Sequence, residues 1–472
     1  MKSPVRIRIN QLKIVIFYIA TIIGCFVLPA KLEIILCGFF VIYLMIEGNN
    51  AIAGKDGNEM AFLLIFPVLL SCIQNIYLGF AVKHLHVFEL QILLTINIII
   101  AAALPAMRIV MTRTLYEHKW CIVCIGGTLL YSFVLFIANR VPVSSFISSM
   151  RNILAPFVFF YFGAVFGKNI DEKSFKKYIV LLINFVVFFG LFEYFVGNGF
   201  WQTANISQLW NLKGIVTAPD EFPSNWFSSE VILGHPYVRR MVSSFADPVN
   251  LGTFLFAAFM LSWYYKKYVL MLLTILCCIF TISKGALLGF LIFCVVIFWY
   301  KEKSKIGLAA AFAGALVIGI AMLKYGAGSS TGLHVLMFLR ALRVPFQYPM
   351  GMGVGTIGVL SGITGGNTSD LYIMETGIGV VIAQLGFWGV ALYVYLFYKM
   401  MMIPRHMTKN KRVFLYTLIF SFFANAMFNE VALSPNSCAL YFIILGIWDA
   451  REKNMLTSGT EVEINENTYL HA

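Results

Sequence analysis

The chain has 472 residues, of which 60% are hydrophobic and 12% are charged, and its mean hydropathy is +0.82. A soluble domain has about a quarter charged residues, so this composition excludes an ordinary soluble protein. The formal net charge is +13. The Lys and Arg residues occupy breaks between apolar runs, which indicates a topology signal and argues against a nucleic-acid partner.

Apolar runs recur along the whole chain. A spanning helix needs about 20 mainly apolar residues, and cutting the chain at charged or turn-rich breaks gives about 14 such runs. We therefore expect an all-α polytopic membrane protein, with residues 1–472 forming a single integral membrane domain. The expected spans cover residues 12–29, 30–46, 60–80, 88–107, 120–138, 152–167, 178–197, 249–265, 268–282, 285–300, 306–323, 371–398, 413–428 and 438–448.

The basic residues also predict sidedness. Most Lys and Arg residues fall in alternate breaks, and such segments remain in the cytoplasm. Both termini are therefore expected to be cytoplasmic, with residues 449–472 as a cytoplasmic tail. The basic N-terminus is followed by no evident small-residue cleavage site, so the first apolar run is expected to be an uncleaved span.

Two breaks on the opposite side, 198–249 and 323–371, are much longer than the others and are predicted to be large outer loops. Long loops with structure of their own are usually functional. The second contains an apolar stretch, 333–342, that ends before Pro345 and predicts a short helix on or in the membrane. In the first loop four aromatic residues suit the membrane interface: Trp201, Trp210, Trp226 and Phe227.

Four arginines lie in these loops, where few cations are expected. Arg239 and Arg240 precede the expected span 249–265, and Arg340 and Arg343 are spaced to share one helix face. A guanidinium matches phosphate oxygens, so the four predict a bound polyanion, with lipid-headgroup anchoring as the alternative.

A basic turn and a glycine-rich segment are further candidates for phosphate binding. Lys284, in the turn Ser283-Lys-Gly, either reaches a phosphate or extends to headgroups. Gly351, Gly353 and Gly355 form G-x-G-x-G, which could present backbone N–H groups to an anion or act as a hinge. The spacing is not that of a dinucleotide-binding fingerprint.

Two titratable residues are candidates for the chemistry. Glu375 lies just inside the expected span 371–398, where a carboxylate marks a site or a structural ion pair. His334 titrates near neutrality, but on an ideal helix it points about 120° from Arg340 and about 180° from Arg343. Glu375 is therefore the preferred base. Glu193 and Glu430 lie near other span ends without an assigned partner.

Two local motifs have structural interpretations. Asp247-Pro248 predicts a helix start, with Asp as the N-cap and Pro in the first turn. Cys121 and Cys124 form C-x-x-C in an apolar run, without the second half of a zinc site. We expect them to be packing residues, and we expect no metal and no cofactor.

Taken together, the layout resembles the bacterial O-antigen polymerase family, which is related to the O-antigen ligases. The similar segments are 240–252 at the end of the first loop, the Ser283-Lys-Gly turn, and Glu375-Thr-Gly-Ile-Gly followed by Gln384-Leu-Gly-Phe-Trp-Gly. Ten residues separate Arg340 from Gly351, as in some members, but eleven separate Arg240 from Gly252. Glu375-Thr stands where the ligases have His-Asn, which favours a polymerase.

The resemblance implies a metal-independent glycosyltransferase of lipopolysaccharide biosynthesis in the bacterial inner membrane. It would join undecaprenyl-diphosphate-linked oligosaccharide repeat units at the periplasmic face, with a flippase and a chain-length regulator as partners. An O-antigen ligase, or a flippase or other transporter without enzymatic activity, is the alternative. Glu375, Arg340 and His334 would be catalytic, and the diphosphate would be held by Arg239, Arg240, Arg340, Arg343, Lys284, Gly351, Gly353 and Gly355.

Overall fold

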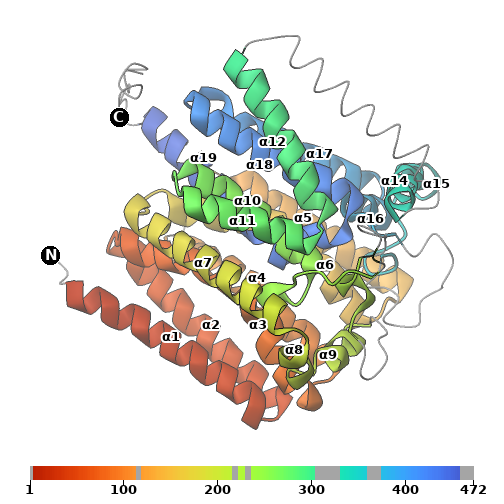
Figure 1. Ribbon diagram of the computed structural model, residues 1–472, viewed down its shortest axis with the longest axis horizontal. Helices are drawn as coiled ribbons and strands as arrows, with labels where there is room; N and C mark the ends of the chain where they lie inside the picture. The colour runs from red at the N-terminus through yellow and green to blue at the C-terminus, as the bar shows by residue number, and fades with distance from the viewer. Residues whose placement is uncertain are drawn as a thin grey trace.

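The computed structural model describes residues 4–112, 118–214, 222–228, 235, 237–302, 330–358 and 374–457. The structure is all-α and 84% helical, and its long helices lie side by side in one bundle (Figure 1). Within the described residues the β structure is an isolated antiparallel bridge between Phe227 and Arg239. The expected fold class is therefore confirmed at this level.

Among the described residues, seven helices are long and apolar enough to cross a membrane. They are Lys31–Ala53, Gly57–His84, Val87–Val110, Lys119–Asn139, Val143–Gly167, Glu172–Val196 and Phe387–His406. Three shorter apolar helices are Asn10–Gly24, Tyr268–Thr281 and Lys284–Tyr300. These features support a multi-pass membrane protein, but they do not show 14 spans, and the expected span 306–323 lies outside the described residues.

The described part of the first half of the chain contains seven long helices. They are α1 (Pro4–Val27), α2 (Ala30–Ala53), α3 (Gly57–Ala81), α4 (Val87–Thr112), α5 (Lys119–Asn139), α6 (Val143–Gly167) and α7 (Glu172–Val196). The start of α6 is nine residues earlier than that of the expected span 152–167. Charged breaks explain other boundaries, because Asp56 and Asp171 each accept backbone N–H bonds as N-caps of α3 and α7.

The second half supplies shorter helices. They are α10 (Pro248–Tyr264), α11 (Tyr268–Thr281), α12 (Lys284–Glu302), α14 (Ser330–Ala341), α15 (Val344–Gln347), α16 (Gly377–Leu385), α17 (Phe387–Met402), α18 (Lys409–Phe428) and α19 (Pro435–Thr457). The predicted start at Asp247-Pro248 is confirmed, because the Asp247 carboxylate accepts the N–H of Val249 at 2.8 Å. The helix predicted for 333–342 is also present, as α14.

The expected single span 371–398 is wrong. Two helices, α16 and α17, replace it, and they meet at Gly386, whose φ of +60° ends α16. The N–H of Phe387 then donates to the carbonyl of Pro349 at 3.0 Å. The break is therefore fixed by the second loop, which packs against the junction of α16 and α17.

The core is built around α6, which packs closely along α19. A Cβ at Gly163 would overlap the carbonyl of Ile443, and a Cβ at Gly446 would overlap that of Phe160, so small residues set this close helix approach. Large apolar side chains lie on the outside of other helices, including Leu130, Phe188 and Val269, at 69%, 58% and 75% exposure. Such an apolar exterior is suited to lipid.

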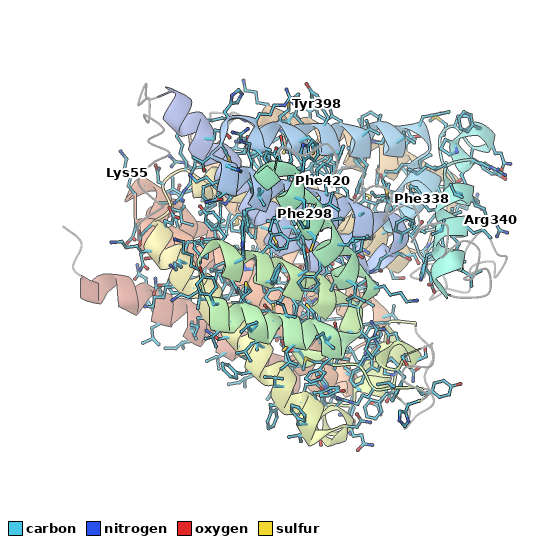
Figure 2. All side chains as sticks on the ribbon, turned by 45° about the horizontal axis from the view of Figure 1, so that its top comes forward. Lys55, Phe298, Phe338, Arg340, Tyr398 and Phe420 are labelled. Carbon is cyan, nitrogen blue, oxygen red and sulfur yellow. The ribbon has the colours of Figure 1, made fainter. Side chains whose placement is uncertain are left out.

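The two ends of the bundle differ. The start of α1 and the end of α19 lie at one end, and α8 (Gly199–Thr203), α9 (Ile206–Leu212), α14 and α15 lie at the other (Figure 1). We call the second the loop end. Lys55 and Arg340 lie at opposite ends in Figure 2. Because α19 continues to Thr457, the first part of the predicted tail 449–472 is helical.

Candidate functional site

At the loop end the structure brings together the two titratable residues that sequence reasoning proposed for the chemistry. Nε2 of His334 on α14 lies 3.5 Å from Oε2 of Glu375, directly before α16. The His334 side chain is 24% exposed and that of Glu375 is 50% exposed. Glu375 is therefore the more accessible member of the pair.

A third titratable residue acts on this pair. Burial lowers the pKa of His334, the charge of Lys284 lowers it further, and the charge of Glu375 raises it. Lys284 begins α12, so three separate segments of the chain meet here. The lowered pKa keeps the His334 imidazole neutral at neutral pH, and a neutral imidazole can donate one N–H to the carboxylate.

The two arginines of the second loop do not join the pair. Arg340 is exposed on α14, and Arg343 is exposed at the N-cap of α15. Because α14 ends at Ala341, the predicted shared helix face is wrong. Neither arginine has an ion-pair partner within the described residues. The expected 120° offset between His334 and Arg340 agrees with one residue facing Glu375 while the other faces outward.

The glycine segment is used for close packing. A Cβ at Gly351 would overlap the carbonyl of Gln384, and a Cβ at Gly355 would lie 2.8 Å from the carbonyl carbon of Ser145. The N–H of Gly351 donates to Tyr348, and that of Gly353 donates to Gln384. These two N–H groups therefore bond to protein carbonyls, and the segment fixes the second loop to the start of α6 and the end of α16.

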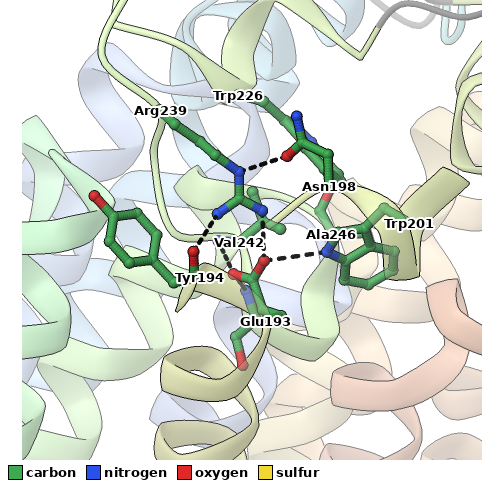
Figure 3. A network of polar contacts seen from close by, with 9 residues as sticks. Glu193, Tyr194, Asn198, Trp201, Trp226, Arg239, Val242 and Ala246 are labelled. Carbon is green, nitrogen blue, oxygen red and sulfur yellow. Dashed lines mark hydrogen bonds and ion pairs between the residues drawn. The ribbon is translucent and has the colours of Figure 1, made fainter. Parts of the chain in front are cut away.

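Arg239 of the first loop is bound within the protein. Its Nη2 lies 2.7 Å from Oε2 of Glu193, and its Nε donates to Oδ1 of Asn198 at 2.7 Å (Figure 3). Glu193 is fully buried and also accepts N–H bonds from Val242 and from the indole of Trp201. This network joins the end of α7 to the segment that leads into α10.

Arg240 anchors the same loop to the next helix. Its Nε donates to the carbonyl of Thr281 at 2.8 Å, and its Nη1 donates to that of Asn225 at 2.9 Å. Burial lowers the pKa of Arg240. Thr281 ends α11 three residues before Lys284, so this contact ties the first loop to the turn that carries Lys284.

The aromatic residues of the first loop form a small core of their own. Trp201 and Trp226 have no exposed surface, and Trp210 is 5% exposed. The indole N–H of Trp226 donates to the carbonyl of Ala246 at 3.0 Å (Figure 3). The three tryptophans therefore fold the first loop, and their position at the membrane interface stays a prediction.

Two cations that sequence reasoning did not single out lie inside the loop end. Arg151 lies within α6, and Lys213 follows α9; both are half-buried. The expected span 152–167 begins one residue after Arg151 and therefore leaves this cation outside the span. A cation next to Asn152, directly before the apolar run of this helix, is the signal that could have found it.

The described residues contain no group of three or more His, Cys, Asp or Glu side chains that could hold a metal ion. Cys121 and Cys124 lie one turn apart on α5, with Cys121 buried in the bundle. No protein-family model matches the chain, and no curated protein is significantly similar to it. The fold therefore indicates the class, a multi-pass α-helical membrane protein.

Proposed function

We propose that the protein is a polysaccharide polymerase that joins undecaprenyl-diphosphate-linked oligosaccharide repeat units, in the manner of the O-antigen polymerases that its sequence resembles. The observation that carries the proposal is the contact between Glu375 and His334 at the loop end. This pair can remove a proton from a sugar hydroxyl, and it lies on a bundle with an apolar exterior that can hold lipid tails.

The proposed step is a displacement at the anomeric carbon of the lipid-linked donor. The acceptor hydroxyl loses its proton to Glu375 while its oxygen forms the new glycosidic bond. The bond between the anomeric carbon and the diphosphate breaks, and the diphosphate leaves with the electron pair. Neutral His334 orients the carboxylate, and nearby cations stabilise the negative charge on the leaving group.

Among the predicted phosphate ligands, Lys284, Arg340 and Arg343 are the exposed ones. Lys284 is close enough to act on His334, so it is placed to meet a diphosphate beside the base. We propose that Arg340 and Arg343 attract the substrate from the membrane surface. Arg239 and Arg240 contribute by holding the first loop against α7 and α11.

A transporter of lipid-linked oligosaccharides is the second candidate, favoured by the half-buried cation Arg151 within a candidate span. Arg151 is eight residues from the loop end of α6, and a transport path would need such groups through the whole bilayer. The dyad of Glu375 and His334 is not required for transport, so we favour the enzyme.

Gel analysis of surface polysaccharide after deletion of the gene tests the proposal. A polymerase defect leaves lipid A core capped with one repeat unit, whereas loss of all capping indicates a ligase or flippase. An unchanged ladder would contradict all three functions. Labelling of single-cysteine variants from outside the membrane tests the proposed periplasmic location of the loop end.

A further inference from the structure

Arg151 and Lys213 form a pair of cations inside the loop end. Nη1 of Arg151 lies 3.4 Å from Oε1 of Gln91 on α4, and Nζ of Lys213 donates to Oδ1 of Asn75 on α3 at 2.6 Å. The charge of Arg151 acts on Lys213, so the two cations are near neighbours. Four separate segments of the chain therefore converge on this point.

The pair lies below the surface of the bundle. At 1.5 Å per residue, Arg151 is about 12 Å from the start of α6 and Asn75 is about 9 Å from the end of α3. Other buried amides also form hydrogen bonds inside the bundle: Gln74 donates to Asn436 at 2.8 Å, and Asn250 accepts from Ser437 at 2.7 Å. The loop end thus has a polar interior that reaches into the bundle.

The positive charge of this pair is poorly balanced. Within the described residues neither cation has an ion-pair partner, and Nε of Arg151 is buried without a hydrogen-bond acceptor. The carboxylate whose charge acts on Lys213 is Asp247, which also acts on Arg240 and which already accepts N–H bonds as the N-cap of α10. Lys213 and Arg240 thus share one carboxylate, and no carboxylate acts on Arg151 within the described residues.

Unbalanced cations that are partly withdrawn from water carry a desolvation cost, which a counter-ion offsets. Burial lowers the pKa of Lys213 to about 7, the charge of Arg151 lowers it, and Asp247 raises it. A bound anion would offset this cost for both cations, since it would accept from the free Nε of Arg151 and from the ammonium of Lys213. A guanidinium and an ammonium together are a common combination for phosphate oxygens.

We propose that Arg151 and Lys213 form a binding site for a phosphate or diphosphate group, with Gln91 and Asn75 orienting the two cations. The site is distinct from Glu375 and His334, and it does not rest on the proposed reaction. The same chemistry is offered by free pyrophosphate and by a lipid-linked diphosphate. The apolar exterior of the bundle can hold a lipid tail, which favours the lipid-linked source.

Competitive amine labelling of the full-length protein in lipid nanodiscs tests the site. With its pKa near 7, Lys213 is expected to react with an acylating reagent at pH 7.5 much faster than Lys83, which is exposed in the 3₁₀ turn Val82–His84 at the same end. Inorganic pyrophosphate and farnesyl diphosphate are the probes, farnesol is the control, and modification at each lysine is read by mass spectrometry.

Protection of Lys213, but not of Lys83, by both diphosphates is the expected result. Protection by farnesyl diphosphate at tenfold lower concentration than pyrophosphate would assign a lipid-linked source. Equal protection would assign a site for the phosphate group alone. Absence of protection by either, or equal protection by farnesol, would overturn the proposal.

A variant series gives a second readout that does not depend on labelling chemistry. Arg151→Met removes the guanidinium group but keeps an unbranched side chain, and it should raise the dissociation constant of farnesyl diphosphate at least tenfold, measured by microscale thermophoresis. Lys83→Gln should leave it unchanged. If Arg151→Met does not fold, Lys213→Met serves in its place, and unchanged affinity in the folded variant would contradict the site.

Discussion

Arg239 and Glu193 form an ion pair of 2.7 Å in which the glutamate has no exposed surface. Glu193 also accepts the backbone N–H groups of Val242 and Ser243, each at 2.9 Å. One carboxylate therefore holds both Arg239 and the chain that leads into α10. This contact gives Arg239 a structural role in the first loop.

Loss of the Glu193 carboxylate should destabilise the protein. Glu193→Ala leaves Arg239 unpaired and two buried N–H groups without acceptors, which costs about 3 kcal/mol or more. The melting temperature in detergent should fall clearly. Glu172→Ala is the matched control, because Glu172 is 51% exposed in its pair with Arg451 and exposed pairs contribute little. Equal melting temperatures for the two variants would contradict this role for Glu193.

Removal of the proposed base should abolish polymerisation without unfolding the protein. Glu375→Gln keeps the shape of the side chain, so we expect a rate about 10² to 10⁴ lower and accumulation of lipid carrying one repeat unit. Because Glu375 is 50% exposed, the melting temperature should be unchanged. Chains that still extend at the normal rate would place the base elsewhere.

The activity should depend on pH through His334. Its pKa is lowered by burial and by Lys284, so the imidazole is neutral at neutral pH. As the pH falls through this pKa, an imidazolium forms beside Glu375 and weakens the base, so the rate should fall on the acid side.

Lys284→Gln removes a charge that lowers the pKa of His334. The acid limb of the pH–rate profile should therefore move to higher pH. Lys83→Gln is the control and should leave the limb in place. The measurement is the polymerisation rate between pH 4.5 and 8. If the acid limb of the profile stays fixed or moves to lower pH in Lys284→Gln, the protonation of His334 does not control the rate.

The role of Arg340 can be tested without disturbing the fold. It is exposed on α14 and has no ion-pair partner in the described part of the chain, so Arg340→Ala should insert and melt like the wild type. We expect it to abolish long-chain glycan. A normal ladder of chain lengths would remove Arg340 from the mechanism.

The glycine segment should be sensitive to substitution for steric reasons. Gly351 has a φ of +83°, and an added Cβ would lie 2.6 Å from the N of Gly386, so Gly351→Ala should lower stability by about 1 to 3 kcal/mol. Gly126 is the control, because a Cβ there meets nothing within 4 Å on α5. A melting temperature of Gly351→Ala equal to that of Gly126→Ala would show that the loop can shift.

Local patterns in the sequence predicted the parts of the fold that depend on near neighbours. The start of α10 at Asp247-Pro248 and the helix α14 before Pro345 follow from capping and proline chemistry. The break at Gly386 could not be predicted in this way. It depends on Pro349 and Gly351, which reach the junction of α16 and α17 from the second loop.

The candidate site was predictable in its residue types and only partly in its pairing. Glu375 and His334 were identified from the sequence, but their contact depends on how α14 packs against α16. Glu193 had no assigned partner because Arg239 lies 46 residues away. Lys213 and Asn75, which are 138 residues apart, could be paired only by the folded first loop.

The most direct test of the proposed function uses the purified protein and one synthetic substrate, an undecaprenyl-diphosphate-linked repeat unit. We predict that the wild type forms longer lipid-linked glycans and releases one undecaprenyl diphosphate for each bond made, without added metal, and that Glu375→Gln does neither. Equal product formation by Glu375→Gln, or no release of undecaprenyl diphosphate by an active, folded wild type, would contradict the account.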